Sequence, residues 1–180
     1  MMVVNDGRGQ DMAKNFVKLV DGLQLKDENA FIELKNDYEF LILEEKKLKF
    51  LSFETVNTFR IPIANIIDAA VTTVTELVEK DKSVVGRGVV GGLIFGPAGL
   101  VLGGLSGVGK KTKKKVDIVY IVSYLSKENE IKNITFSLPG DTFGAVKKFA
   151  KNFKKILDET KRSEEVSKIL NQSEQDEFIL

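Results

Sequence analysis

Side chains that commonly carry out enzymatic chemistry are scarce in this chain. Its 180 residues include no Cys and no His. Without Cys, the chain has no disulfide, no thiolate nucleophile and no thiolate metal ligand. Without His, it lacks the usual near-neutral acid or base and the commonest metal ligand. We therefore expect a protein that is not an enzyme and that binds no cofactor and no metal ion.

Two glycine motifs have the spacing of nucleotide-binding loops but lack the surrounding elements. Residues 86–91 read Gly-Arg-Gly-Val-Val-Gly, a G-x-G-x-x-G pattern, yet no βαβ unit surrounds them. Residues 104–111 nearly spell a phosphate-binding P-loop, but Lys111 stands where a Ser or Thr must bind Mg²⁺. A P-loop must also lie between a strand and a helix, whereas these glycines precede a predicted strand. Nucleotide binding is therefore disfavoured at both positions.

The most unusual segment is residues 89–108, which carries no charge and is rich in glycine. Glycines recur at every fourth position on both sides of Pro97. This spacing places them on one face of a helix, where a second helix can approach to backbone contact. The pattern predicts a glycine-zipper helical hairpin that turns at Pro97. The residues expected to contact a membrane or another copy are Gly88, Gly92, Leu93, Ile94, Phe95, Gly96, Gly99, Leu100, Val101, Gly103 and Gly107.

Length and flanking charge favour a membrane wedge over a membrane span. Each arm of the predicted hairpin has about 10 residues, or ~15 Å of helix, which is about half of a ~30 Å hydrocarbon core. Flanking cations each add about 1 kcal/mol of attraction to an anionic leaflet. An apolar segment plus a basic cluster supplies the two signals that stable peripheral attachment needs. The predicted anionic-surface site comprises Arg87, Lys110, Lys111, Lys113, Lys114 and Lys115.

Other partners are compatible with the same segment. Each glycine costs about 1 kcal/mol relative to alanine inside a helix, so close packing has to offset that cost. The hairpin can pack on the domain itself, or it can drive homo-oligomerisation of a soluble protein-interaction scaffold. A third hypothesis is a regulated pore-forming effector. Nucleic acid is not an expected partner, because no aromatic residues are interleaved with the lysine cluster.

Composition and charge place the protein in solution or at a membrane surface. The chain is 43% hydrophobic and 29% charged, which is typical of a soluble globular protein. Its formal net charge of +1 implies no overall attraction to nucleic acid or lipid. The first residues are polar and do not resemble a signal peptide. We expect a cytoplasmic protein that can attach peripherally to the inner face of the membrane.

The remaining sequence predicts strands and two helices. Helical spacing predicts a short amphipathic helix at residues 11–23 and a long one at 143–157, with Asp141 as the N-cap of the latter. Residues 44–47 read as a polar hairpin turn. We expect a solvated helix face at Lys147, Lys148, Lys151, Lys154 and Lys155. Apolar runs bounded by polar turns predict strands at residues 30–34, 40–43, 48–53, 66–78, 116–124 and 131–138.

The order of these elements resembles a known family. A strand pair at residues 40–53, an Ile-Pro-Ile-Ala-Asn-Ile-Ile step at residues 61–67 and a closing helix are similar to a bacterial pleckstrin-homology-like (PH-like) domain. The resemblance implies an α+β fold: a strongly bent, partly open antiparallel β-barrel capped by a C-terminal amphipathic helix, here with a glycine-rich helical hairpin inserted. It also implies binding of lipid headgroups, peptides or protein surfaces, without catalysis. Six strands are predicted, one fewer than such domains usually have.

The predicted organisation has five parts. An N-terminal tail and short helix occupy residues 1–24, and the first part of the PH-like domain occupies 25–83. The glycine-zipper insertion occupies 84–109. The second part of the domain, with its capping helix, occupies 110–160, and a polar C-terminal tail or frayed helix occupies 161–180.

Overall fold

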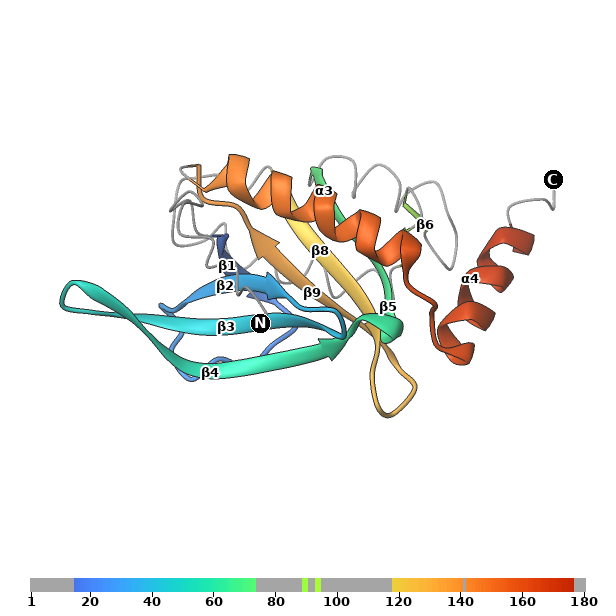
Figure 1. The fold of residues 1–180 in the computed structure, drawn as a ribbon, viewed down its shortest axis with the longest axis horizontal. Coiled ribbons are helices and arrows are strands. Elements are labelled where there is room, and N and C mark those ends of the chain that lie inside the picture. Colours follow the sequence, from blue (N-terminus) through green and yellow to red (C-terminus); the bar gives the residue numbers. More distant parts are fainter. Residues whose placement is uncertain (1–14, 74–88, 91–92, 95–117, 141, 177–180) are drawn as a thin grey trace, which may run out of the picture.

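A seven-stranded antiparallel sheet, packed against a long helix, forms the body of the protein (Figure 1). The computed structural model describes residues 15–73, 89–90, 93–94, 118–140 and 142–176. The strand order is β4-β3-β2-β1-β9-β8-β5. These strands are β1 (Phe16–Asp21), β2 (Phe31–Asn36), β3 (Phe40–Lys49), β4 (Ser52–Pro62), β5 (Ile66–Thr73), β8 (Ile118–Leu125) and β9 (Ile131–Ser137).

The sheet bends without closing. Its two edge strands, β4 and β5, are consecutive in the chain and are joined by a 3-10 turn at Ile63–Asn65. Strands β6 (Val89–Val90) and β7 (Leu93–Ile94) form a separate two-stranded sheet. The predicted α+β PH-like architecture is therefore confirmed: the seven-stranded antiparallel sheet is not closed into a barrel and is packed against a helix.

Helix α3 (Phe143–Glu159) covers the inner face of the sheet (Figure 1). Alternation along the strands directs apolar side chains to that face, and the helix supplies a matching apolar stripe. The core residues of α3 are Val146, Ala150, Phe153 and Leu157, which pack with residues of β1–β5, β8 and β9. The long helix predicted from residues 143–157 is confirmed.

The predicted N-terminal helix is wrong, because residues 16–21 form strand β1 in the middle of the sheet. Val17 pairs with Ile32 of β2, and Leu19 pairs with Phe136 of β9. The register of β1 against β9 shifts between Leu19 and Asp21, which interrupts the strict alternation of a strand. Hydrogen bonding to two neighbouring strands outweighs the helical spacing of a short segment. Strand β1 is the seventh strand that was missing from the prediction.

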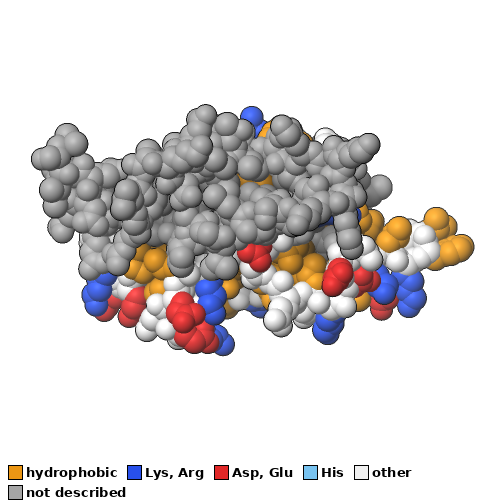
Figure 2. Space-filling view, turned by 180° about the vertical axis from the view of Figure 1, so that it is seen from behind, with side chains coloured by type: hydrophobic (Ala, Val, Ile, Leu, Met, Phe, Trp, Pro, Cys, Tyr) orange, Lys and Arg blue, Asp and Glu red, His pale blue; other side chains and the backbone are white. Residues whose placement is uncertain are grey.

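The predicted turn at residues 44–47 is also wrong, because these residues lie within β3. The chain turns at Phe50 and Leu51, and β4 begins at Ser52. The β3–β4 hairpin is therefore longer than predicted, and its end projects beyond the rest of the molecule (Figures 1 and 2).

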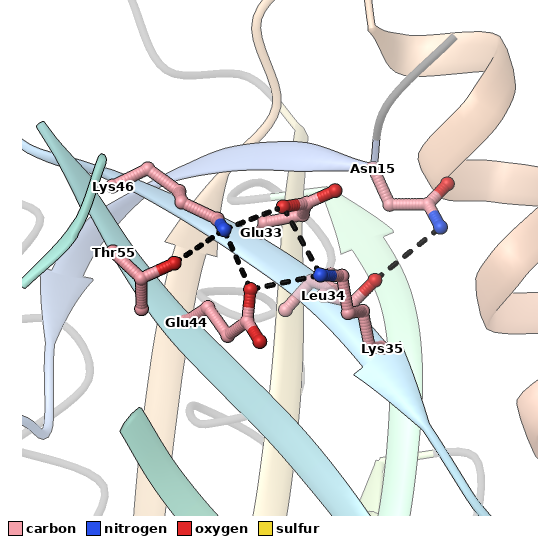
Figure 3. Close-up of polar contacts among 7 residues, drawn as sticks. All are labelled: Asn15, Glu33, Leu34, Lys35, Glu44, Lys46 and Thr55. Atoms are coloured by element: carbon pink, nitrogen blue, oxygen red, sulfur yellow. Dashed lines mark hydrogen bonds and ion pairs between the residues drawn. The ribbon is translucent and has the colours of Figure 1, made fainter. Parts of the chain in front are cut away.

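Charged residues are accommodated within this hairpin by ion pairs on the outer face of the sheet (Figure 3). The Lys46 ammonium lies 2.7 Å from a Glu44 carboxylate oxygen and 3.2 Å from a Glu33 oxygen. Lys35 lies 2.8 Å from the same Glu44 oxygen. Hydrogen bonds from Lys35 and then Lys46 hold the pKa of Glu44 below its usual value. Opposite charges on adjacent strands thus allow a strand where the local sequence suggested a turn.

The C-terminal region, predicted as a polar tail or frayed helix, contains a second helix. Helix α4 (Glu164–Asp176) follows α3, and its Val166 is fully buried against Ile67 and Leu125. The predicted N-cap of α3 is wrong, since Thr142 occupies that position. The Thr142 hydroxyl donates a 2.8 Å hydrogen bond to the Phe16 carbonyl and so ties the start of α3 to β1. Asp141 lies outside the described residues.

Candidate binding surfaces

The glycine-rich insertion leaves the sheet and rejoins it at neighbouring positions. Strand β5 ends at Thr73, β8 begins at Ile118, and these two residues are cross-strand partners. Strand β7, within the insertion, lies beside β5. Both ends of the segment between Thr73 and Ile118 therefore meet at one place on the sheet, as an inserted hairpin requires.

Only two of the residues predicted to contact a membrane are described. Leu93 and Ile94 form β7 and pair with Val90 and Val89 of β6. These four residues are extended, so the predicted first helical arm is not helical there. The other predicted glycines and apolar residues, with Arg87 and the lysines at 110–115, lie outside the described residues, and their helical hairpin stays a prediction.

The lysines of α3 differ in their roles. Lys147, Lys148, Lys151 and Lys155 are exposed or partly exposed, as expected of a solvated face. Lys154 instead donates a 2.8 Å hydrogen bond to the carboxylate of Asp68 on β5, a residue that is only 3% exposed. The sequence carried a signal for this contact, because Asp68 interrupts an apolar run at residues 66–71.

Several polar groups surround the Asp68 carboxylate. Its Oδ1 atom also accepts the N–H of Ala69 at 2.8 Å. Burial of the Lys154 ammonium acts to lower its pKa. The hydrogen bond to Asp68 and the negative charges of Asp68 and Asp158 act in the opposite direction and outweigh burial, so the pKa of Lys154 is raised. Burial, and then the charge of Asp68, raises the pKa of Tyr120, so its hydroxyl stays neutral. This cluster neutralises charge between α3 and the sheet and contains no activated nucleophile.

Arg162 lies near the same cluster, in the connection between α3 and α4. Its Nε and Nη1 atoms are buried and have no hydrogen-bond partner among the described residues. Burial lowers the pKa of Arg162, while the charges of Asp158 and Asp68 partly offset the effect.

In the described part of the chain, no group of three or more Asp or Glu residues is placed to hold a metal ion.

The loop between β1 and β2 is held by a buried carboxylate. Glu45 is fully buried in the middle of β3, and its Oε1 atom accepts the backbone N–H of Asp27 at 2.8 Å. Asp27 in turn pairs with Lys47 at 3.0 Å. The nearby Lys26 ammonium donates to the Val56 carbonyl at 3.1 Å. Because Asp27 and Glu28 both lie in this loop, it offers no concentration of positive charge for an anionic headgroup.

Sequence reasoning missed one exposed feature, the end of the β3–β4 hairpin. Phe50 and Leu51 are 93% and 88% exposed, whereas the sequence placed them inside a strand. Two adjacent bulky apolar residues between Lys49 and Ser52 were the available signal. That these two side chains are exposed could be seen only from the structure, which places the β3–β4 turn at Phe50 and Leu51.

An open seven-stranded antiparallel sheet covered by a C-terminal helix, with an insertion between β5 and β8, defines a PH-like domain. PH-like domains are generally non-catalytic binding modules. A family model described as "glycine zipper containing PH domain" matches residues 25–137. The chain belongs to this family. No curated protein and no solved structure matches the chain.

The structure extends the domain beyond the matched residues. Strand β1 precedes residue 25 and α3 follows residue 137, yet both contribute to the hydrophobic core. Neither α3 nor α4, the helices that the structure describes, is long and apolar enough to cross a bilayer.

Proposed function

We propose that the protein associates peripherally with anionic membranes through residues 84–115. The observation that carries this proposal is the direct succession of an uncharged glycine-rich run and a lysine cluster. An apolar segment and a polybasic segment bind a membrane more strongly together than either does alone. The Thr73–Ile118 pairing supports the proposal, because it brings the two ends of the segment to one place on a rigid sheet.

The glycines have a distinct role in this proposal. Wherever they lie on one face, backbones can approach closely, so the segment can form a compact apolar hairpin with little side-chain bulk. A hairpin of that kind enters one leaflet without spanning the bilayer. The PH-like domain then serves as the platform that carries the segment and offers a second surface to a protein partner.

Neutralising Lys113 and Lys114 with glutamine is expected to weaken binding to anionic vesicles about thirtyfold, since each lysine near the surface contributes about 1 kcal/mol. Flotation with vesicles of phosphatidylcholine and phosphatidylserine measures the loss. The matched control replaces Lys147 and Lys148, which are exposed on α3, with glutamine. Equal losses in both variants, or no flotation of the wild-type protein at any salt concentration, would refute the proposal.

The alternative is a soluble scaffold that forms homo-oligomers through the same glycines. The four-residue glycine spacing favours it, because that spacing suits contacts between copies as well as within one chain. Light scattering of Gly92→Leu and Gly103→Leu variants tests it: loss of a wild-type oligomer, without any flotation of the wild type, favours the scaffold. Leakage of vesicle contents would identify a pore-forming effector instead.

A further inference from the structure

The β3–β4 hairpin ends in four exposed or partly exposed apolar residues that we call the hairpin tip: Leu48, Phe50, Leu51 and Phe53. Phe50 and Leu51 form the turn, and Leu48 and Phe53 are cross-strand partners beneath it. Figure 2 shows hydrophobic side chains gathered where the hairpin projects from the molecule, with basic side chains near them. Large apolar side chains presented to water in this way mark an interaction site.

The turn itself uses an unfavourable residue. Phe50 has φ of 55°, in the left-handed region that bulky residues rarely adopt. Glycine is favoured at the first position of many two-residue hairpin turns, and a phenylalanine there is strained. Phenylalanine at this position therefore makes the folded state less stable than glycine would. Strain retained at an exposed position is typical of functional sites.

The hairpin tip rests on a rigid base. The Phe53 ring lies 4.7 Å from the Phe16 ring of β1 and 6.1 Å from the Phe31 ring of β2, measured between centroids. Hydrogen bonds between β3 and β4 continue to the Lys49–Ser52 pair next to the turn. Little backbone entropy remains to be lost on binding, because the strand pairing already fixes the backbone up to the turn.

Basic side chains surround this base. Lys18, Lys47 and Lys49 are exposed, and the Lys18 ammonium lies 4.8 Å from the centroid of the Phe31 ring. Lys47 and Lys49 pair with Asp27 and Glu54 at 3.0 and 3.3 Å. The Lys49–Glu54 pair is exposed at both side chains and therefore contributes little to stability, whereas Asp27 is partly buried and its pair with Lys47 helps to hold the β1–β2 loop. An apolar tip above a collar of lysines is complementary to the acyl chains and phosphates of an anionic bilayer.

We propose that the hairpin tip inserts into the boundary between headgroups and acyl chains of an anionic membrane, as a second contact beside the glycine-rich segment. The inference rests on the proposed function, since both contacts need a membrane, but it uses different residues. A bilayer suits a convex tip because it deforms around the inserted side chains, whereas a protein partner would need a matching groove.

The absence of Trp from the chain allows a direct test with single-tryptophan reporters. In Phe50→Trp, the tryptophan emission should shift to the blue on addition of phosphatidylcholine–phosphatidylserine vesicles, and brominated acyl chains should quench it. Tyr38→Trp is the matched control, because Tyr38 is 99% exposed at the β2–β3 turn, at the other end of β3. Its emission should not change.

A second variant separates binding from folding. Phe50→Gly combined with Leu51→Ser relieves the strained turn, so the thermal stability should be equal to that of the wild type or higher. Its vesicle partitioning should nevertheless fall by at least about tenfold, because two large apolar side chains are lost from the tip. Tyr38→Ser should partition like the wild type.

The outcomes distinguish this inference from the proposed function. If the wild type floats but the reporter in Phe50→Trp stays in water, or F50G/L51S floats like the wild type, the hairpin inference is overturned and residues 84–115 remain the membrane contact. If F50G/L51S loses flotation and K113Q/K114Q does not, the hairpin inference holds and the proposed site is overturned. No flotation of the wild type overturns both. A blue-shifted emission of Phe50→Trp already present without vesicles would assign the tip to a protein contact and overturn the inference.

Discussion

Replacing Gly22 with alanine is expected to destabilise the fold by about 3–5 kcal/mol, through strain and overpacking together. Gly22 follows β1 and has φ of 98°, which alanine adopts only with strain. An added Cβ would overlap the Asn133 carbonyl oxygen and lie 2.8 Å from the Ile134 Cα. Both are backbone atoms of β9, which pairs with β1 and β8 and cannot retreat. Urea unfolding followed by circular dichroism measures the change.

Gly144 provides a control with the opposite sign. It is exposed in the first turn of α3, and a Cβ there meets nothing within 4 Å. Alanine at this position should stabilise the protein by about 0.5–1 kcal/mol, because glycine is a poor helix former. A G22A protein as stable as the wild type would contradict the close contact between the end of β1 and β9.

Replacing Lys154 with methionine is expected to cost about 2–3 kcal/mol of stability. The change leaves the Asp68 carboxylate buried without its ion-pair partner, an arrangement that costs about 3–5 kcal/mol when both partners are fully buried. Lys154 is about half exposed, so solvent screening reduces the loss. Lys151→Met, on the exposed face of the same helix, should change stability by less than about 0.5 kcal/mol.

The Lys154 pair also predicts a pH dependence. Its pKa in the folded protein is raised above the ordinary value of 10.5. The stabilising contribution is therefore complete below pH 10.5 and is lost as the pH rises through the folded-state pKa. The stability difference between the wild type and Lys154→Met should stay constant from pH 7 to about pH 10 and shrink above that. A difference that disappears between pH 7 and 9 would mean that another group is responsible.

Local patterns predicted the elements whose side chains alternate regularly or repeat with helical spacing. Strands β2, β5, β8 and β9 and helix α3 lie close to where the sequence placed them. Strand β2 and helix α3 each present one face to the core, whereas β5 and β8 are nearly continuous apolar runs in which consecutive residues are buried. The family resemblance rested on the order of these elements, and the match over residues 25–137 confirms it.

Where prediction failed, contacts distant in sequence changed the outcome. Residues 16–21 have helical spacing, but pairing with β2 and β9 makes them a strand. Residues 44–47 have the composition of a turn, but Glu44 and Lys46 find partners on β2 and β4 and remain in β3. Because β3 continues to Lys49, the chain turns at Phe50 and Leu51, and these two residues are exposed at the end of the hairpin rather than inside a strand.

The amino-acid sequence alone excluded catalysis by Cys or His side chains, because composition does not depend on folding. It also identified the glycine-rich segment and the lysines that follow it, because residue spacing does not depend on folding either. Folding was needed to reveal the Asp68–Lys154 pair, whose partners are 86 positions apart, and the projecting hairpin tip. Burial and exposure are properties of the whole packed sheet: a side chain's surroundings depend on which strands lie beside it, and local sequence does not specify those neighbours.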